Sequence, residues 1–311
     1  MKILYIVCPN GFGHVKRSVI ISEELIKLNS KISIHWYLSK YSNEFLASNA
    51  SVELLKNSSF NIFNNNQSIS LANLKHSLFA ERFKIWSQNL ELLIKQNNFD
   101  LLISDNLSSP LLYHENCLMV GSFLWYDVIK SEKNNELVLN QEKNIFRELK
   151  PTIYSMKDFV MPEIKRYGNA IEVPSLIDKY IIKNKTGPIE KRTSILVTAG
   201  KSKQQIDLLK KLKNNLYDEK LFNIYSDKLL VKDSNENSSF IFDYSEESFT
   251  QLKIIICRPG IGIITDAIRY DIPLIVNRYY SNLEMEHNSK IIEKLGIGIR
   301  IDFEDFQKFK N

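Results

Sequence analysis

Short apolar runs that end in glycine-containing turns are the clearest pattern in this chain. Near its end, the run Ile-Ile-Ile at 254–256 passes into Cys-Arg-Pro-Gly-Ile-Gly at 257–262 and then into an amphipathic segment. At its start, the run 2–7 passes into Asn-Gly-Phe-Gly-His at 10–14, and Ile21, Leu25 and Leu28 then follow at helical spacing. Each pattern predicts a buried strand, a tight turn and a helix, and the N-terminal helix is expected over 15–28.

The rest of the first half divides into alternating strands and helices. One helix begins at Leu78, and its large apolar side chains repeat at spacings of four and three on one face, which we expect in the core: Phe79, Phe83, Trp86, Leu90 and Leu93. A second helix is expected over 136–149. Strands are expected at 32–37, 52–55, 60–63, 101–103, 117–120 and 158–161, with an Asn/Ser-rich loop at 64–70.

A stretch rich in proline, glycine and basic residues separates two halves, and we place a linker at 166–192. Beyond it, we expect strands at 194–198, 222–225, 240–242 and 272–276, a turn at 199–202, and helices at 204–212, 282–295 and 302–311. Alternating strands and helices predict parallel sheets with helices on both faces. The predicted fold class is α/β, with two doubly wound Rossmann-like domains at 1–165 and 193–311 whose glycine loops face each other across a cleft.

The turn at 257–262 has the composition of a phosphate-binding site. Gly260 and Gly262 let backbone N–H groups approach an anion closely, and the following helix directs the positive end of its dipole to the same point. Arg258 adds a positive charge for a diphosphate, and Asp266 falls early in the helix, where a ribose hydroxyl would lie. A single glycine turn also fits an ordinary strand-to-helix connection, but the second turn at 10–14 favours the phosphate interpretation.

Composition indicates a globular cytoplasmic protein. The chain has 311 residues, 44% of them hydrophobic, which suits two domains. Its three cysteines, Cys8, Cys117 and Cys257, are far apart and predict buried thiols, with neither a disulfide framework nor a zinc site. The net charge of +5 fits a solvated surface, or attraction to a nucleotide diphosphate or an anionic membrane surface. We expect no nucleic-acid partner and no membrane-spanning segment.

The segment Gly-Phe-Gly-His-x-x-Arg at 11–17 resembles the first loop of glycosyltransferases of the GT-B fold. The closest likeness is to the lipid II-forming N-acetylglucosaminyl transferases and the UDP-glycosyltransferases. The order of strand, glycine turn, helix with an early acid, proline-containing strand and polar segment near the C-terminus resembles the donor half of these families. The resemblance covers residues 1–30 and 190–302, and it implies a nucleotide-sugar donor, with Gly11, Gly13 and Gly200 among the donor-binding residues.

His14 is the candidate catalytic base. It follows a glycine turn at the carboxyl end of the first predicted strand, where α/β sheets place their ligands, and an imidazole titrates near neutrality. Asp105 ends another predicted strand, and in the resembling UDP-glycosyltransferases an aspartate at a similar distance along the chain orients the histidine ring. Two structural alternatives stay open: His14 as an ordinary loop residue, and Asp105 as a turn or N-cap residue.

The resemblance also implies further donor contacts. Phe242 and Tyr244 occupy the position at which such families hold the uracil, although an ordinary strand end fits equally well. Glu284 lies where those families place the residue that binds sugar hydroxyls, with Asn288 four residues later. The alternative for Glu284 is a capping box, Ser281-x-x-Glu284, at the start of the last long helix. Asp266 replaces a glutamate of the resembling families, which shortens its reach to a ribose.

These features predict an inverting hexosyltransferase that moves a sugar from a nucleotide diphosphate, in particular UDP, to a hydroxyl group. We expect no cofactor, and no metal because there is no Asp-x-Asp pair and a helix dipole with Arg258 can neutralise the leaving diphosphate. A glycan, lipid-linked or small-molecule acceptor of the cell envelope is expected, with peripheral membrane association as an option. Two alternatives remain: a hydrolase resembling those of the pseudaminic acid pathway, which share the 11–17 motif and use water as acceptor, and a nucleotide-sugar-binding protein without turnover.

Overall fold

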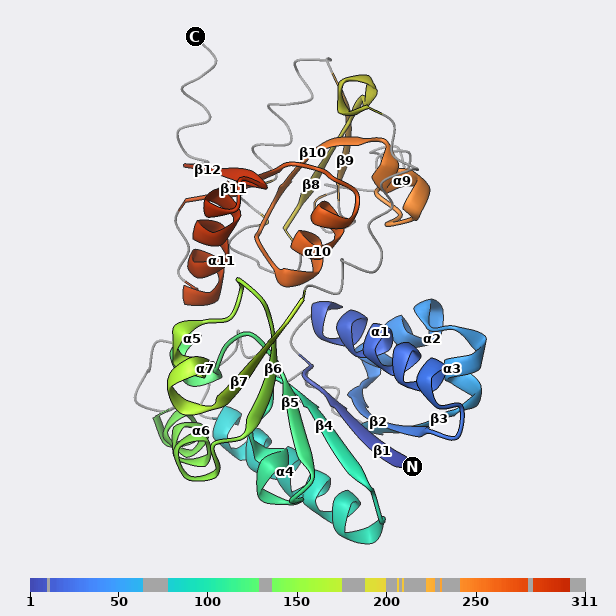
Figure 1. Ribbon diagram of the computed structural model, residues 1–311, viewed down its shortest axis with the longest axis vertical. Coiled ribbons are helices and arrows are strands. Elements are labelled where there is room, and N and C mark those ends of the chain that lie inside the picture. Colours follow the sequence, from blue (N-terminus) through green and yellow to red (C-terminus); the bar gives the residue numbers. More distant parts are fainter. Residues whose placement is uncertain are drawn as a thin grey trace. The chain divides into compact units, whose positions relative to one another are not determined.

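The computed structural model describes residues 1–9, 12–63, 78–128, 136–174, 188–199, 206, 209, 222–226, 230, 241–278 and 282–302. Contacts divide the chain into two compact units, Met1–Val173 and Pro174–Asn311 (Figure 1). The predicted loop at 64–70, most of the turn at 199–202 and of the helix at 204–212, and nearly all of the helix at 302–311 lie outside the described residues.

The first unit contains a seven-stranded sheet, counted over the described residues, in the order β3-β2-β1-β4-β5-β6-β7. All its strand pairs are parallel. The strands are β1 Lys2–Val7, β2 Ser33–Ser39, β3 Ser58–Phe63, β4 Leu101–Asp105, β5 Cys117–Val120, β6 Thr152–Met156 and β7 Asn169–Val173. The strand order reverses between β1 and β4, which makes the carboxyl ends of these two strands the topological switch point of the sheet.

Helices cover both faces of this sheet, because successive side chains of its buried strands point to opposite faces. Ile3 and Tyr5 of β1 pack in one core with α1, whereas Leu4 packs in the other core with Leu90 of α4. The helices are α1 Phe12–Leu28, α2 Lys40–Asn49, α3 Val52–Lys56, α4 Leu78–Gln96, α5 Trp125–Val128, α6 Glu136–Leu149 and α7 Pro162–Tyr167. Of the predicted apolar stripe on α4, Leu90 and Leu93 belong to the core, and the side chains of Phe79, Phe83 and Trp86 lie outside the described residues.

Two predicted strands of the first unit are wrong. The segment 52–55 forms helix α3, because the Ser51 hydroxyl caps it by accepting a hydrogen bond from the Leu54 backbone N–H at 3.2 Å. The segment 158–161 begins in a turn, where Asp158 has a φ of +69°, and continues as irregular chain. The strands that complete the sheet are β6 and β7, and β7 lies within the segment 166–192 that we predicted as a linker.

The second unit contains a five-stranded parallel sheet, within the described residues, in the order β12-β11-β10-β8-β9. Its strands are β8 Ser194–Thr198, β9 Asn223–Ser226, β10 Leu252–Cys257, β11 Leu274–Asn277 and β12 Gly298–Ile301, and its described helices include α9 Glu246–Thr250, α10 Ile261–Arg269 and α11 Leu283–Lys294. The predicted strand at 240–242 is reduced to an isolated bridge between Ile241 and Ser226. The order reverses between β8 and β10, so each unit is a doubly wound α/β structure, as predicted.

Candidate active site

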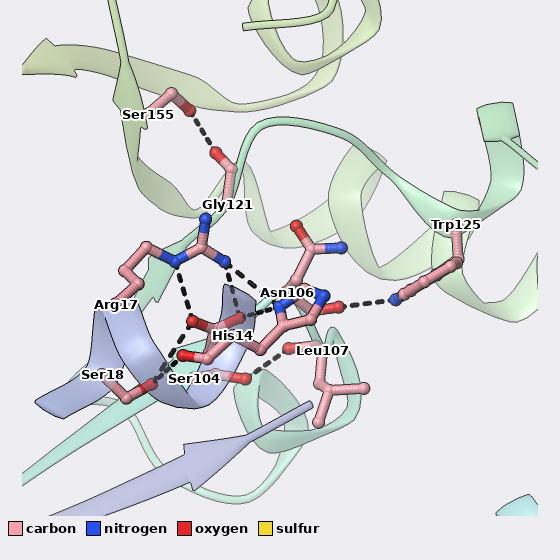
Figure 2. A network of polar contacts seen from close by, with 10 residues as sticks. His14, Arg17, Ser18, Ser104, Asn106, Leu107, Gly121, Trp125 and Ser155 are labelled. Carbon is pink, nitrogen blue, oxygen red and sulfur yellow. Dashed lines mark hydrogen bonds and ion pairs between the residues drawn. The ribbon is translucent and has the colours of Figure 1, made fainter. Parts of the chain in front are cut away.

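A buried ion-pair network lies at the switch point of the first sheet (Figure 2). His14 is in the first turn of α1, just after β1, and its Nδ1 lies 2.5 Å from Oδ1 of Asp105, the last residue of β4. Arg17 donates to both oxygens of the same carboxylate, from Nε to Oδ2 at 2.9 Å and from Nη2 to Oδ1 at 2.7 Å. The Asp105 side chain is fully buried, whereas those of His14 and Arg17 are 12% and 17% exposed.

The contacts decide which ring nitrogen of His14 carries the proton. Burial alone would raise the pKa of Asp105, but the charges of Arg17 and His14 and their hydrogen bonds hold it below its usual range. Asp105 is therefore ionised near neutrality, and an ionised carboxylate only accepts hydrogen bonds. The 2.5 Å contact then requires a proton on Nδ1 of His14, so in the neutral ring the lone pair lies on Nε2. This is the tautomer that a general base needs.

The turn that follows Asp105 is held by its own hydrogen bonds (Figure 2). Asn106 has a φ of +56°, in the left-handed region that asparagine tolerates, and its carbonyl accepts a bond from Trp125 Nε1 at 2.8 Å. The Ser104 hydroxyl donates to the Leu107 carbonyl at 2.6 Å. A Cβ on Gly121 would lie 2.1 Å from Asn106 Oδ1, so a glycine is needed there. These contacts fix the path of the chain directly after Asp105, the last residue of β4.

Sequence reasoning placed Arg17 in the 11–17 motif but gave it no role. Residues three and four positions apart lie on the same face of a helix, so Arg17 and Ser18 share the face of α1 that carries His14. The Ser18 hydroxyl donates to the His14 carbonyl at 2.8 Å and is 3.4 Å from Asp105 Oδ2. The helical spacing was the available signal, but it identifies these residues only once the position of β4 is known.

The predicted phosphate turn lies at the switch point of the second sheet. Gly260 is the N-cap of α10 with φ −75° and ψ 147°, and as a glycine it supplies no side-chain acceptor to the first-turn N–H groups of the helix. Arg258 lies just after β10, and its backbone N–H donates to the Thr198 carbonyl at the end of β8 at 3.2 Å. Gly262 is in the first turn of α10. The turn therefore combines a helix N-terminus with an adjacent basic residue, which is what an anion site needs.

Helix α11 supports this turn from its buried face. Asn288 is 1% exposed, and its Nδ2 donates to the Pro259 carbonyl at 3.0 Å. The alternative interpretation of Glu284, as part of a capping box with Ser281, is not met, because Asn282 is the N-cap and its Oδ1 accepts from the Met285 N–H at 3.2 Å. Glu284 lies in the first turn of α11 and is half-buried. The structure thus brings Asn288 to the phosphate turn and leaves Glu284 near the start of the same helix.

The predicted base-binding segment is near the end of β8. Phe242 is 4% exposed and its ring packs edge-on against those of Tyr225, Tyr244 and Phe249. Tyr244 has a φ of +61° and is 46% exposed, and its hydroxyl lies 3.4 Å from Thr198 Oγ1. Phe242 therefore belongs to the core, and Tyr244 presents the accessible ring.

The structure describes two of the remaining predicted donor residues, Asp266 and Gly13. Asp266 lies in the second turn of α10 and is 6% exposed, so most of its side chain is enclosed by the second unit. Gly13 is in the first turn of α1 and is exposed. Gly11 and Gly200 lie outside the described residues.

In the part of the chain that the structure describes, no three His, Cys, Asp or Glu side chains are grouped so that they could hold a metal ion. Across the same residues, no helix combines the length and apolar character required to cross a membrane.

Two doubly wound parallel units, one with a His–Asp pair at its switch point and the other with a glycine turn, define the class of GT-B glycosyltransferases. The chain belongs to the family described as glycosyl transferase family 1, whose model matches residues 1–310. The finer likeness to the lipid II-forming transferases does not follow from this match. No curated protein matches the chain in sequence.

Solved structures similar to this chain are also glycosyltransferases. The glycotransferase of kitacinnamycin has a TM-score of 0.62 and 12% identity, over 97% of this chain and 86% of that one. UGT89C1 of Arabidopsis thaliana, complexed with UDP-L-rhamnose, has a TM-score of 0.62 and 12% identity, over 97% and 85%. A UDP-glucose:anthocyanidin 3-O-glucosyltransferase in complex with UDP has a TM-score of 0.61 and 11% identity, over 99% and 88%. At such identities the likeness shows the fold.

Proposed function

We propose that this glycosyltransferase is an inverting, metal-independent hexosyltransferase that uses a UDP-sugar donor and a hydroxyl acceptor, with His14 as its general base. The observation that carries the proposal is the 2.5 Å contact between His14 Nδ1 and Asp105, because in the neutral ring it assigns the proton-accepting lone pair to Nε2. A buried carboxylate behind the ring also stabilises the imidazolium that forms, as in other His–Asp catalytic pairs.

The proposed step is a single displacement at the anomeric carbon. The acceptor oxygen attacks the anomeric carbon from the face opposite the diphosphate, and a new C–O bond forms. The bond between the anomeric carbon and the β-phosphate oxygen breaks, and its electron pair leaves with UDP. The acceptor proton moves to Nε2 of His14. One displacement of this kind inverts the anomeric configuration.

The leaving diphosphate is assigned to the phosphate turn of the second unit. The uncapped first turn of α10 offers N–H groups and the positive end of a helix dipole, and Arg258 offers a full charge. Together these donors can stabilise the developing negative charge without a divalent cation. Tyr244, with its accessible ring, is assigned to the base, and Glu284 to the sugar, while Asn288 holds the turn through the Pro259 carbonyl. Structures of the similar proteins with UDP and UDP-L-rhamnose support the choice of UDP.

The acceptor class is a carbohydrate, lipid-linked or small-molecule hydroxyl, and we place the reaction in cell-envelope glycan synthesis on the cytoplasmic side. The net charge of +5 is compatible with peripheral attraction to an anionic membrane that carries such an acceptor.

Thermal unfolding with a panel of nucleotide sugars will first identify the donor. A ligand at about 100 times its dissociation constant stabilises the folded state by about 2.7 kcal/mol. Release of UDP from the selected UDP-sugar is then measured with and without a panel of acceptors. We expect release that the acceptor stimulates, and a loss of about 10²- to 10⁴-fold in His14→Ala, the usual cost of removing a general base.

Each other outcome indicates a different function or mechanism. Equal release without acceptor indicates a hydrolase with water as acceptor, and binding without release indicates a nucleotide-sugar-binding protein. A folded His14→Ala variant with near-native turnover would show that His14 is not the base. Retained anomeric configuration in the product would exclude the single displacement.

A further inference from the structure

We propose that Arg17 is a positioning residue for this base. Its guanidinium orients Asp105 and offsets the charge of the carboxylate, so that His14 keeps its proton on Nδ1 and presents an unprotonated Nε2. The inference rests on the proposed role of His14, and it assigns Arg17 an action through Asp105 with no contact to the substrate.

The geometry of the pair supplies the orienting part of this role. Arg17 uses two donors, Nε and Nη2, against the two oxygens of Asp105, at 2.9 and 2.7 Å. A forked contact of this kind fixes the plane of a carboxylate, which a single-point cation does not. Oδ1 receives both Arg17 Nη2 and His14 Nδ1, so the fork also fixes the direction in which the imidazole ring is held.

The charge of Arg17 supplies the second part of its role, which is to keep the His14 ring neutral. An isolated carboxylate beside an imidazole favours the doubly protonated ring, because opposite charges at this separation stabilise each other. Arg17 offsets that carboxylate, and its Nη2 also lies 3.2 Å from His14 Nδ1, where it repels an imidazolium directly. Both effects keep the ring neutral before the reaction, when a base must be unprotonated.

The charges around this group are well defined. Burial alone would lower the pKa of Arg17, but the charge of Asp105 and its hydrogen bonds raise it above its usual range, so Arg17 remains a cation. Among the described residues, Tyr5 on β1 and Cys8 just after β1 are further titratable side chains that act on Arg17. Burial, together with the charge of Asp105, raises the pKa of Tyr5, so its hydroxyl is neutral at working pH. The charge balance at the ring is therefore set by Asp105 and Arg17.

The decisive measurement is the pH profile of kcat/KM, read as UDP release from the selected UDP-sugar. In Arg17→Gln the acidic limb should move to higher pH by about one unit or more, the scale for a charge at this distance, and activity should recover as the pH rises. In Arg17→Lys the charge stays, so the limb should move by less than half of that, while kcat falls about tenfold because the fork is lost. Lys27→Gln, a charge removal in the last turn of the same helix, should change neither quantity.

The His14 ring can be followed without any substrate by ¹⁵N NMR, with its signal assigned from His14→Gln. The wild-type ring should carry its proton on Nδ1, and the midpoint of its titration should rise in Arg17→Gln. An unchanged midpoint and limb in folded Arg17→Gln would overturn the proposal and leave Arg17 as a structural ion pair. If the glutamine variant does not fold, Arg17→Lys decides: wild-type turnover over the whole pH range would overturn the orienting role. Failure of His14 as the base would appear separately, as an active His14→Ala enzyme.

Discussion

At the residue scale, His14 and His35 of the first unit show how local partners decide what an imidazole does. His14 has a carboxylate on one side and one ring nitrogen free for chemistry. His35 on β2 has a serine hydroxyl at each ring nitrogen, Ser59 Oγ at 2.5 Å from Nδ1 and Ser33 Oγ at 3.2 Å from Nε2. Both nitrogens of His35 are thus used within the fold, which makes it a structural residue.

We expect His35 to make the stability of the protein depend on pH. Burial, and secondarily the charge of Lys2, hold the pKa of His35 below its usual range. The unfolded chain therefore binds this proton more readily, so stability is fully present above the unfolded pKa of about 6.5 and falls as the pH drops below it, until the folded form is protonated too. The melting temperature should decline between about pH 7 and pH 5, and less steeply in His35→Gln. An equal decline in both proteins would contradict this.

Contacts between individual residues also limited how much of the site could be predicted from the sequence. His14 and Asp105 could be proposed because each follows an apolar run, and the carboxyl ends of parallel strands share one edge of a sheet. The role of Arg17 could not be predicted. Its partner, Asp105, lies 88 residues away in the chain, and their contact depends on how α1 packs on β4. Asn288 was expected at the sugar, whereas its buried contact with the Pro259 carbonyl depends on the path of α11.

At the element scale, the strength of the apolar pattern decided what could be predicted. Helix α6 has the bounds predicted for it, 136–149, and β5 has the bounds 117–120, because their apolar positions are regular. Helix α3 is a single short turn set by its serine cap, and β7 is an edge strand with most residues exposed or half-buried. Elements of this kind bury few side chains, so their sequences carry little periodic signal.

Two glycines of the second unit should lose stability to different extents when replaced by alanine. A Cβ on Gly298, the first residue of β12, would lie 2.3 Å from the Leu274 carbonyl oxygen and 2.9 Å from Ile292 Cγ2. The backbone carbonyl cannot move away without breaking the pairing of β11 with β12, so Gly298→Ala should destabilise the fold by about 1 to 3 kcal/mol, the usual cost of overpacking. Chemical denaturation measures this loss, and native stability in Gly298→Ala would contradict the close packing of β12.

Gly260→Ala is the matched control. A Cβ there meets no atom within 4 Å, and the φ of −75° suits any residue. Its cost in stability should stay below about 1 kcal/mol, the scale of an N-cap change. UDP affinity should nevertheless fall, because the added methyl group stands at the turn that the diphosphate must approach. Unchanged UDP binding by calorimetry would argue against the phosphate turn.

At the scale of the whole molecule, the sequence predicted the type of each half better than the division between them. Two glycine turns, each between an apolar run and a helix, were sufficient to predict two doubly wound sheets, and both sheets have their polar candidates at the switch point. The first compact unit ends at Val173, whereas we expected the first domain to end at 165. The stretch 166–173 was assigned to the linker because glycine and charged residues also occur in the turns around an edge strand.

The proposed chemistry requires the two switch points to act on one sugar. The base belongs to the first unit and the phosphate turn to the second, and a base must come within hydrogen-bond reach of the acceptor hydroxyl while the diphosphate leaves from the opposite face of the anomeric carbon. We therefore predict that a crystal structure with the selected UDP-sugar will place His14 and Gly260 on one cleft, with the anomeric carbon between them. Calorimetry should show that Arg258→Ala weakens UDP binding by about 1.5 to 3 kcal/mol, the scale for hydrogen bonds to charged groups, whereas His14→Ala retains it. A sugar held away from His14, or switch points on opposite sides of the molecule, would refute this arrangement, because no base could then reach the reacting oxygen.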